Sequence, residues 1–365
     1  MSSGKKLKLL FKINTPGAVH TWRDVIRTLE DKGHEVTILA RDYGGTVELL
    51  DKYGFRFRPL NAIKSKYLKI FEIVLHIREG WKLSNEFKPD IIMGFGVDAA
   101  LVGALCRKPS IVFTDSEPLP VQHFLNRLLA TAILTPSCFR KDLGKKQVRL
   151  AGYKECAYLH PNYFQPDSSI YDELGISATE KYVVLRFNAF DAFHDIGKQG
   201  FSLADKYCLV RELEKRCRVF ISAEGSLPQD LECYKLPILY ERIHHALYFA
   251  QLVVADTQTL TTEAAVLGTP SIRCNNFVGT NDMGILIELE QKYDLIYCFR
   301  DSQKAIQKAV ELASRPDLKQ EWAIKRQRLL ADKIDVTQFM VWFIENYPHS
   351  FEECQRKQVS REPTK

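Results

Sequence analysis

Several features are missing from this 365-residue sequence, and each absence excludes a class of protein. No apolar run approaches the ~20 residues that a membrane-spanning helix needs. The amino-terminal stretch is basic and then apolar, but lysines interrupt it and no small-residue cleavage site follows, so it does not match a signal peptide. None of the nine cysteines forms a C-x-x-C pair, and there is no Asp-x-Asp motif or histidine cluster. We therefore expect neither a disulfide framework nor a zinc site, no metal and no other cofactor.

The composition is that of a globular protein, with 45% hydrophobic residues and a mean hydropathy of −0.20. A formal net charge of +6 suits an anionic small substrate or a loose association with a membrane surface. The positive charge is too diffuse along the sequence to indicate a nucleic-acid-binding protein. We expect a cytoplasmic protein with reduced cysteines, at the inner face of the membrane if it associates with one. The oligomeric state is left open.

Short apolar runs alternate with helical patterns along most of the chain, which predicts two doubly wound, Rossmann-like α/β domains with parallel sheets. Each domain would hold about 150–200 residues. The predicted segments are an amino-terminal domain (1–151), a linker (152–178), a carboxyl-terminal domain (179–335), a terminal helix (336–348) and a disordered tail (349–365).

Residues 253–273 stand out because a buried strand, a polar turn, a helix, a Gly-x-Pro stop and a new strand follow one another. The free N–H groups of a helix N-terminus make such a turn a natural seat for phosphate, and Glu263, about one turn inside the helix, could accept sugar hydroxyls. The alternative is purely structural, with Thr259 or Thr261 capping the helix and Glu263 completing a capping box. The residues alone do not decide between these interpretations.

Two further strand ends of the second domain carry candidate ligand groups. Arg186 ends the first strand, where a guanidinium can bind a diphosphate in a bidentate manner. Glu224 follows the next strand, where it could border a nucleobase or belong to an ordinary turn. Arg273 begins the strand after the Gly-x-Pro stop and is a further candidate for substrate binding.

The first domain offers candidates for the acceptor side. Gly17 lies in the turn after the first strand, where a glycine lets the backbone approach a ligand, and His20 follows near the helix N-terminus as a base or sugar contact. A solvated surface histidine is the alternative. Asp115 and Glu117 end a buried strand at the carboxyl edge of the sheet, where open α/β sheets bind ligands. They could act as a base or bind sugar hydroxyls, or simply form a capping turn.

One motif supports a different class of protein. Residues 94–99 (GFGVDA) match G-x-G-x-x-A between a strand and a helix, and Asp115 follows at a suitable distance. This pattern makes a nicotinamide-dependent oxidoreductase an alternative. The motif lies in a late βαβ unit, however, and a tight strand-to-helix turn explains it as well.

The two α/β halves and residues 255–270 (ADTQTLTTEAAVLGTP) resemble the GT-B superfamily of nucleotide-sugar enzymes. Residues 115–136 (DSEPLPVQHFLNRLLATAILTP) and 152–161 (GYKECAYLHP) resemble, more narrowly, the domain of unknown function 354 family. Broader relatives include non-hydrolysing UDP-N-acetylglucosamine 2-epimerases, which carry paired glycines at the positions of Gln258 and Thr259, and MurG-like glycosyltransferases.

The resemblance implies a GT-B fold with the ligand in an interdomain cleft and a UDP-sugar held mainly by the second domain. In relatives the polar turn holds phosphate and its glutamate holds the ribose. Those roles would fall on Thr259, Leu260, Thr261 and Thr262 for the phosphate and on Glu263 for the ribose. Arg186 would help to stabilise the leaving UDP.

The sequence-based prediction is a glycosyltransferase that acts in cell-surface polysaccharide or glycolipid synthesis on a glycan or lipid-linked acceptor. His20 or Asp115 would be its base, with Glu117 beside them. The alternatives are an epimerase-type isomerase, a non-catalytic nucleotide-sugar-binding protein and the oxidoreductase.

Overall fold

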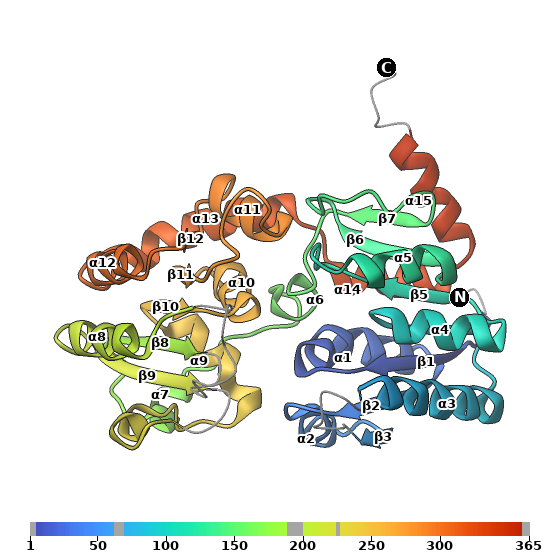
Figure 1. The fold of residues 1–365 in the computed structure, drawn as a ribbon, viewed down its shortest axis with the longest axis horizontal. Coiled ribbons are helices and arrows are strands. Elements are labelled where there is room, and N and C mark those ends of the chain that lie inside the picture. Colours follow the sequence, from blue (N-terminus) through green and yellow to red (C-terminus); the bar gives the residue numbers. More distant parts are fainter. Residues whose placement is uncertain (1–4, 62–68, 188–199, 224–226, 360–365) are drawn as a thin grey trace. The chain divides into compact units, whose positions relative to one another are not determined.

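The computed structural model describes residues 5–61, 69–187, 200–223 and 227–359, which form two compact α/β units (Figure 1). The first unit is Met1–Tyr158 with Lys333–Lys365, and the second is Leu159–Asp332. The chain therefore returns to the first unit after it completes the second. No described helix is long and apolar enough to cross a membrane.

The first unit is built on a sheet of seven parallel strands in the order β3-β2-β1-β4-β5-β6-β7. Its strands are β1 Lys8–Ile13, β2 Glu35–Asp42, β3 Phe57–Asn61, β4 Ile91–Phe95, β5 Ser110–Phe113, β6 Ala132–Pro136 and β7 Gln147–Leu150. Its helices are α1 Pro16–Asp31, α2 Thr46–Lys52, α3 Lys69–Phe87, α4 Val97–Cys106, α5 Pro120–Leu129, α14 Val336–Glu345 and α15 His349–Val359, and α6 Cys156–Leu159 lies at its boundary.

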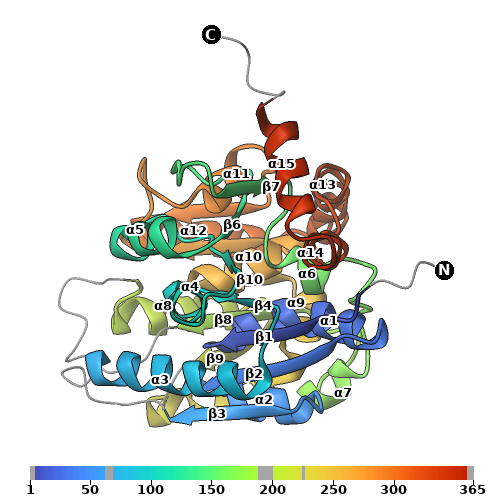
Figure 2. The same cartoon turned by 90° about the vertical axis from the view of Figure 1, so that its right-hand side faces the viewer.

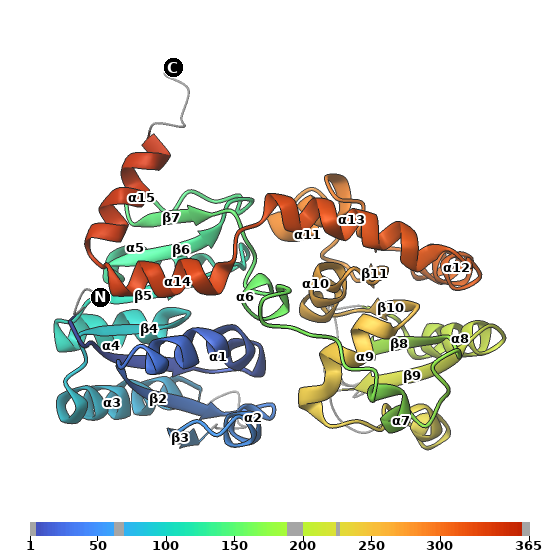
Figure 3. The ribbon, with the colours of Figure 1, turned by 180° about the vertical axis from the view of Figure 1, so that it is seen from behind.

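Helices cover both faces of this sheet. In Figures 1 and 2, α3, α4 and α5 form one layer, and the view from behind in Figure 3 shows α1 and α14 on the opposite face. Strands that are covered on both faces read as continuous apolar runs, and Leu9, Leu10 and Phe11 of β1 have no exposed surface. The strand order reverses between β1 and β4, so the carboxyl ends of these two strands form the switch point of the sheet.

The second unit has five parallel strands in the order β12-β11-β10-β8-β9. They are β8 Tyr182–Phe187, β9 Arg218–Ala223, β10 Leu252–Ala255, β11 Ser271–Cys274 and β12 Ile296–Phe299. The helices are α7 Ile170–Leu174, α8 Leu203–Glu214, α9 Ile243–Phe249, α10 Gln258–Leu267, α11 Gly284–Gln291, α12 Ser302–Ala313 and α13 Leu318–Asp332, with 3-10 turns η2 Gln229–Tyr234 and η3 Tyr240–Arg242. Its switch point lies between β8 and β10. The predicted fold class, two parallel-sheet α/β domains, is confirmed.

The carboxyl-terminal tail differs from the expectation of disorder, because residues 349–359 form α15. Ser350 is fully buried and its hydroxyl donates to the Phe343 carbonyl at 2.6 Å. The side-chain amides of Gln355 and Gln358 donate to the carbonyl oxygens of Gln147 and Arg149 in β7, at 2.7 and 3.2 Å. The tail is polar because one of its faces binds the backbone at the edge of a sheet, so polarity did not indicate disorder.

Gly152 follows β7 and packs against Ile334 and Val336, in the segment that returns to the first unit. A Cβ atom at Gly152 would lie 2.4 Å from Cγ2 of Val336, the first residue of α14. We expect Gly152→Ala to lower the free energy of unfolding by about 1–3 kcal/mol, because either the turn or α14 must shift. Urea denaturation measures the effect. Gly17→Ala is the matched control, since nothing described lies within 4 Å of a Cβ at Gly17 and the change falls in a helix. Equal stabilities of the two variants would contradict the prediction.

Candidate functional site

The switch point of the second unit brings two predicted site segments together. Arg186 near the end of β8 is in register with Ala255 at the end of β10, and the amide of Asp256 donates to the Arg186 carbonyl at 3.2 Å. Helix α10 begins two residues later. In an open parallel sheet this edge is where ligands bind, so β8 and α10 supply the walls of the candidate site.

Helix α10 starts at Gln258 with Thr257 as its N-cap, and Thr257 makes no side-chain capping hydrogen bond within the described chain. The capping-box alternative is wrong, because the helix begins earlier than Thr259 and the Glu263 side chain meets a different helix. The hydroxyl of Thr261 donates back to the Thr257 carbonyl at 2.8 Å. The N-terminus of α10 therefore presents backbone N–H groups and partial positive charge without a side-chain cap, which is a suitable seat for an anion.

The predicted phosphate contacts on α10 fall into two groups. Thr261 and Thr262 are buried, and the Thr262 hydroxyl donates to the Gln258 carbonyl at 3.1 Å, so both hydroxyls bond within their own helix. Leu260 is buried, whereas Thr259 is exposed in the first turn. Of these residues, Thr259 presents a side chain to solvent and the others can contribute only through the backbone.

Glu263 is held by a histidine that sequence analysis did not connect with it. Both side chains are buried, and Nε2 of His244 on α9 lies 3.1 Å from the Glu263 carboxylate. The pair fixes the carboxylate about one and a half turns into α10. The two residues are 19 positions apart in different elements, so no local motif could have linked them.

Asp256 and Asn275 tie the loops of this edge together. The Asn275 side-chain amide donates to the Asp256 carbonyl at 3.0 Å, which connects the end of β11 to the end of β10. A Cβ atom at Gly200 would lie 2.3 Å from that of Asp256, so only glycine fits beside this carboxylate. The polar turn is thus held by contacts from two other segments.

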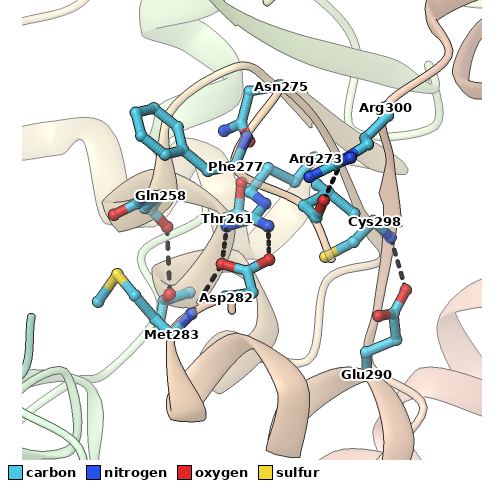
Figure 4. A network of polar contacts seen from close by, with 12 residues as sticks. Gln258, Thr261, Arg273, Asn275, Phe277, Asp282, Met283, Glu290, Cys298 and Arg300 are labelled. Atoms are coloured by element: carbon cyan, nitrogen blue, oxygen red, sulfur yellow. Dashed lines mark hydrogen bonds and ion pairs between the residues drawn. The ribbon is translucent and has the colours of Figure 1, made fainter. Parts of the chain in front are cut away.

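Arg273 does not reach a ligand-facing surface, which corrects its predicted role in substrate binding. Its side chain has no exposed surface, and both terminal nitrogens bind the carboxylate of Asp282, one of them at 3.2 Å (Figure 4). Asp282 also accepts from the Met283 amide at 2.8 Å, immediately before α11. Arg273 therefore stabilises the loop between β11 and α11 from inside the unit.

Arg186 and Glu224 are the remaining candidates of the second unit. A guanidinium nitrogen of Arg186 donates to the Ser222 hydroxyl at 2.8 Å, so this side chain leans toward β9 along the sheet edge. Glu224 lies outside the described residues. Its role stays a prediction.

In the first unit, His20 is buried in α1. Its ring stacks on Tyr158 at 5.4 Å between centroids, and Nδ1 lies 3.3 Å from the Tyr53 hydroxyl. The solvated alternative for His20 is therefore wrong. Thr15 caps this helix by accepting from the Ala18 amide at 3.3 Å, and Gly17 sits in the first turn with open space at its Cβ position.

Asp115 forms a charged cluster with two residues that sequence reasoning missed. Lys154 donates to the Asp115 carboxylate and lies 3.1 Å from that of Glu155, at the turn before α6. Glu155 is buried, and one of its carboxylate oxygens has no hydrogen-bond partner among the described residues. Burial raises the pKa of Glu155 to about 7, although the ammonium of Lys154 opposes the rise. The cluster places two carboxylates and an ammonium beside the carboxyl end of β5.

Glu117 has a structural position near the same edge. Its carboxylate accepts from the Arg140 amide at 3.2 Å, and its carbonyl lies 3.1 Å from Nε2 of His123. The first bond joins the end of β5 to the loop after β6, and the second joins it to α5. A direct catalytic role for Glu117 stays a prediction.

The glycine motif at 94–99 lies at the switch point of the first sheet. Gly94 is in β4, where a Cβ atom would come within 2.8 Å of the Lys12 carbonyl, and Gly96 precedes α4 with a φ of 80°. Close strand packing and a tight turn thus account for both glycines. Asp115, the expected ribose contact of this motif, is bound to Lys154. No group of three or more His, Cys, Asp or Glu side chains that could hold a metal occurs within the described residues.

The chain belongs to the family described as Protein of unknown function (DUF354), whose model matches residues 7–315. An uncharacterized protein of Methanocaldococcus jannaschii is 23% identical over 274 residues, which are 70% of this chain and 78% of that protein.

Among solved structures, the chain is similar to Staphylococcus aureus MnaA with UDP (TM-score 0.66, 14% identity, 95% of this chain and 98% of that one). It is also similar to the Neisseria meningitidis UDP-GlcNAc 2-epimerase bound to UDP-GlcNAc (0.64, 13%, 93% and 99%). Acinetobacter baumannii MurG matches as well (0.56, 16%, 93% and 99%). At these identities the likeness establishes the fold, which is GT-B.

Proposed function

We propose that this protein is a glycosyltransferase that takes its sugar from a UDP-linked donor. The N-terminus of α10 at the switch point of the second sheet carries this proposal, because it presents N–H groups without a side-chain cap beside a carboxylate fixed by His244. MnaA is similar over nearly the whole chain and its structure contains UDP. The shared fold and the anion seat at the N-terminus of α10 support a nucleotide diphosphate here.

The charge of each group determines the role that we propose for it. The diphosphate would meet the α10 N–H groups around Thr259 and the guanidinium of Arg186, which stabilise negative charge as UDP leaves. The Glu263 carboxylate would accept the ribose hydroxyls. The acceptor hydroxyl attacks the anomeric carbon of the sugar, the bond to the diphosphate breaks, and a base takes the hydroxyl proton. Asp115 is a better candidate for that base than His20, because its carboxylate is partly exposed.

We expect Glu263→Ala to weaken UDP binding by about tenfold to a hundredfold, since a hydrogen bond to a charged group contributes about 1.5–3 kcal/mol. Isothermal titration calorimetry with UDP measures the change. Glu290→Ala is the matched control, because Glu290 is a half-buried carboxyl group of the same unit that accepts from the Cys298 amide at 2.7 Å (Figure 4). Unchanged UDP affinity in a folded Glu263→Ala variant would remove the donor site from α10.

The epimerase alternative is favoured by the similarity to the Neisseria enzyme and has a separate test. Incubation with UDP-N-acetylglucosamine and no acceptor yields a second UDP-sugar only if the protein is an isomerase. Binding of UDP without turnover on any acceptor would favour a non-catalytic sugar-nucleotide-binding protein. Tight binding of NAD(P) without UDP would favour the oxidoreductase. We expect UDP release that depends on an added acceptor.

A further inference from the structure

Helix α5 in the first unit has its apolar side chains on the outside. Val121, Phe124 and Leu128 are 71%, 66% and 64% exposed, and their spacing places them along one face of the helix. The residues of α5 that are buried are His123 and Asn126. Neither side-chain polar atom of Asn126 has a hydrogen-bond partner among the described residues. A helix of a water-soluble domain normally buries its apolar face, so the outward face of α5 is suited to burial against something else.

The exposed face continues beyond α5 itself. Leu119, directly before the helix, is 40% exposed, and Leu105 at the end of the neighbouring α4 is 57% exposed. Helices α4 and α5 run side by side in the same layer (Figure 2). A protruding row of large apolar side chains of this kind can enter the boundary between lipid headgroups and acyl chains.

Basic residues surround the carboxyl end of this face. The turns 105–110, 127–131 and 142–147 contain five lysines and arginines and one acidic residue, Asp142. They meet at the amino ends of β5, β6 and β7. Nζ of Lys146 donates to the Leu128 carbonyl at 3.0 Å, the Thr131 amide donates to the Ser110 carbonyl at 3.0 Å, and the Arg127 guanidinium lies beside Gly144.

The apolar row and the basic turns together favour one kind of binding partner for this face. A second copy bound through the same face in a two-fold dimer would offer these basic turns no acidic side chain of that face, because residues 118–131 contain none. An anionic bilayer satisfies both the apolar row and the basic turns. We propose that the outward face of α5, with Leu105 and Leu119, docks on the surface of membranes that contain anionic lipids. This inference goes beyond the proposed transfer reaction and does not depend on it.

Vesicle co-sedimentation of the full chain tests the proposal. We expect binding to vesicles of phosphatidylcholine and phosphatidylglycerol in equal parts, weaker binding to phosphatidylcholine alone, and release when salt is added. Phe124→Glu with Leu128→Glu places two charges on the apolar face, and we expect at least about a tenfold loss of vesicle binding. The matched control is Ile324→Glu on α13 of the second unit, a single exposed apolar residue, which should bind like the unmodified protein.

A second variant tests whether the basic turns contribute to lipid binding. Lys108→Gln with Lys145→Gln neutralises two basic residues of the turns, and we expect it to weaken binding to the phosphatidylglycerol vesicles while leaving the weak binding to phosphatidylcholine unchanged. Absence of vesicle binding at low salt, or unchanged binding by the Phe124→Glu, Leu128→Glu protein, would overturn the proposal. So would a shift from dimer to monomer by light scattering in that protein without vesicle binding, because the face would then join two copies. Calorimetry with UDP in solution is independent of all these outcomes.

Discussion

Replacing Asp282 by alanine should lower the free energy of unfolding by about 3–5 kcal/mol, because it leaves the guanidinium of Arg273 buried without its counter-charge. Arg273 has no exposed surface, and Asp282 is nearly as deeply buried. The carboxylate binds two guanidinium nitrogens and the Met283 amide, so the alanine variant loses three hydrogen bonds at once. The effect is large because water cannot reach the charge that remains.

Urea denaturation of the single and double variants measures this effect. Arg273→Met combined with Asp282→Leu should recover most of the stability, since a buried ion pair can be replaced by apolar side chains of similar volume at little cost. Glu311→Ala breaks an exposed pair with Lys308 and serves as the control, with an expected loss below about 1 kcal/mol. If Asp282→Ala were no more destabilising than Glu311→Ala, the pair would not hold the unit together.

The same variant has a consequence for the candidate site. Arg273 lies in β11, and Asn275 just after this strand donates to the Asp256 carbonyl at the start of the polar turn. Loss of the Arg273–Asp282 pair frees the loop that carries Asn275. We therefore expect Asp282→Ala to weaken UDP binding as well, although neither residue touches the proposed ligand.

The alternation of strands and helices could be predicted from the sequence because each depends on a local pattern. The terminal helix predicted at 336–348 is α14, Val336–Glu345. Gly17 was predicted in the turn after the first strand but lies in α1, which begins at Pro16 because Thr15 supplies the cap and proline fits the first helical position. The sequence analysis named Thr259 or Thr261 as the cap of α10. The helix begins earlier, at Gln258, with Thr257 as an N-cap that makes no side-chain capping hydrogen bond.

The partners of the candidate residues could not be predicted, because they come from distant parts of the chain. Lys154 contacts Asp115 across 39 positions and His244 contacts Glu263 across 19. The order of strands decides which carboxyl ends meet, and a repeating strand–helix pattern does not reveal that order. Arg273 looked like a ligand contact because it is a charged residue near the turn that we propose to bind phosphate. Its counter-charge lies nine positions later, after a segment without regular period.

The burial of a lysine in the first unit was also not predicted from the sequence. Lys12 lies in β1 between β2 and β4, has no exposed surface, and Nζ has no hydrogen-bond partner among the described residues. It shares a sheet face with Leu10, which belongs to the apolar core of that face. Burial lowers the pKa of Lys12 from 10.5 to about 8, an effect that Asp98 opposes and Arg41 reinforces.

Lys12→Met should therefore raise the free energy of unfolding at pH 7 by about 3 kcal/mol, because folding at that pH must bury a charged ammonium whose pKa burial has lowered. Between pH 10.5 and 8 the unfolded chain binds a proton that the folded chain does not. The stability of the unmodified protein accordingly falls as pH decreases through this range and stays low below it. The methionine variant lacks this dependence and extends the apolar core beside Leu10.

Urea denaturation of both proteins at several values between pH 7 and 10.5 tests the prediction. The two stabilities should converge toward pH 10.5 and differ most below pH 8. Lys8→Met is the matched control, since Lys8 lies on the same strand and face but its side chain is 45% exposed, so its removal should leave the pH dependence unchanged. A Lys12→Met protein that is less stable than the original at pH 7 would show that the ammonium is stabilised inside the fold. Lys12 would then belong to a polar group at the switch point of the first sheet, together with Asp98 and with Asn14, whose amide donates to the Asp98 carboxylate.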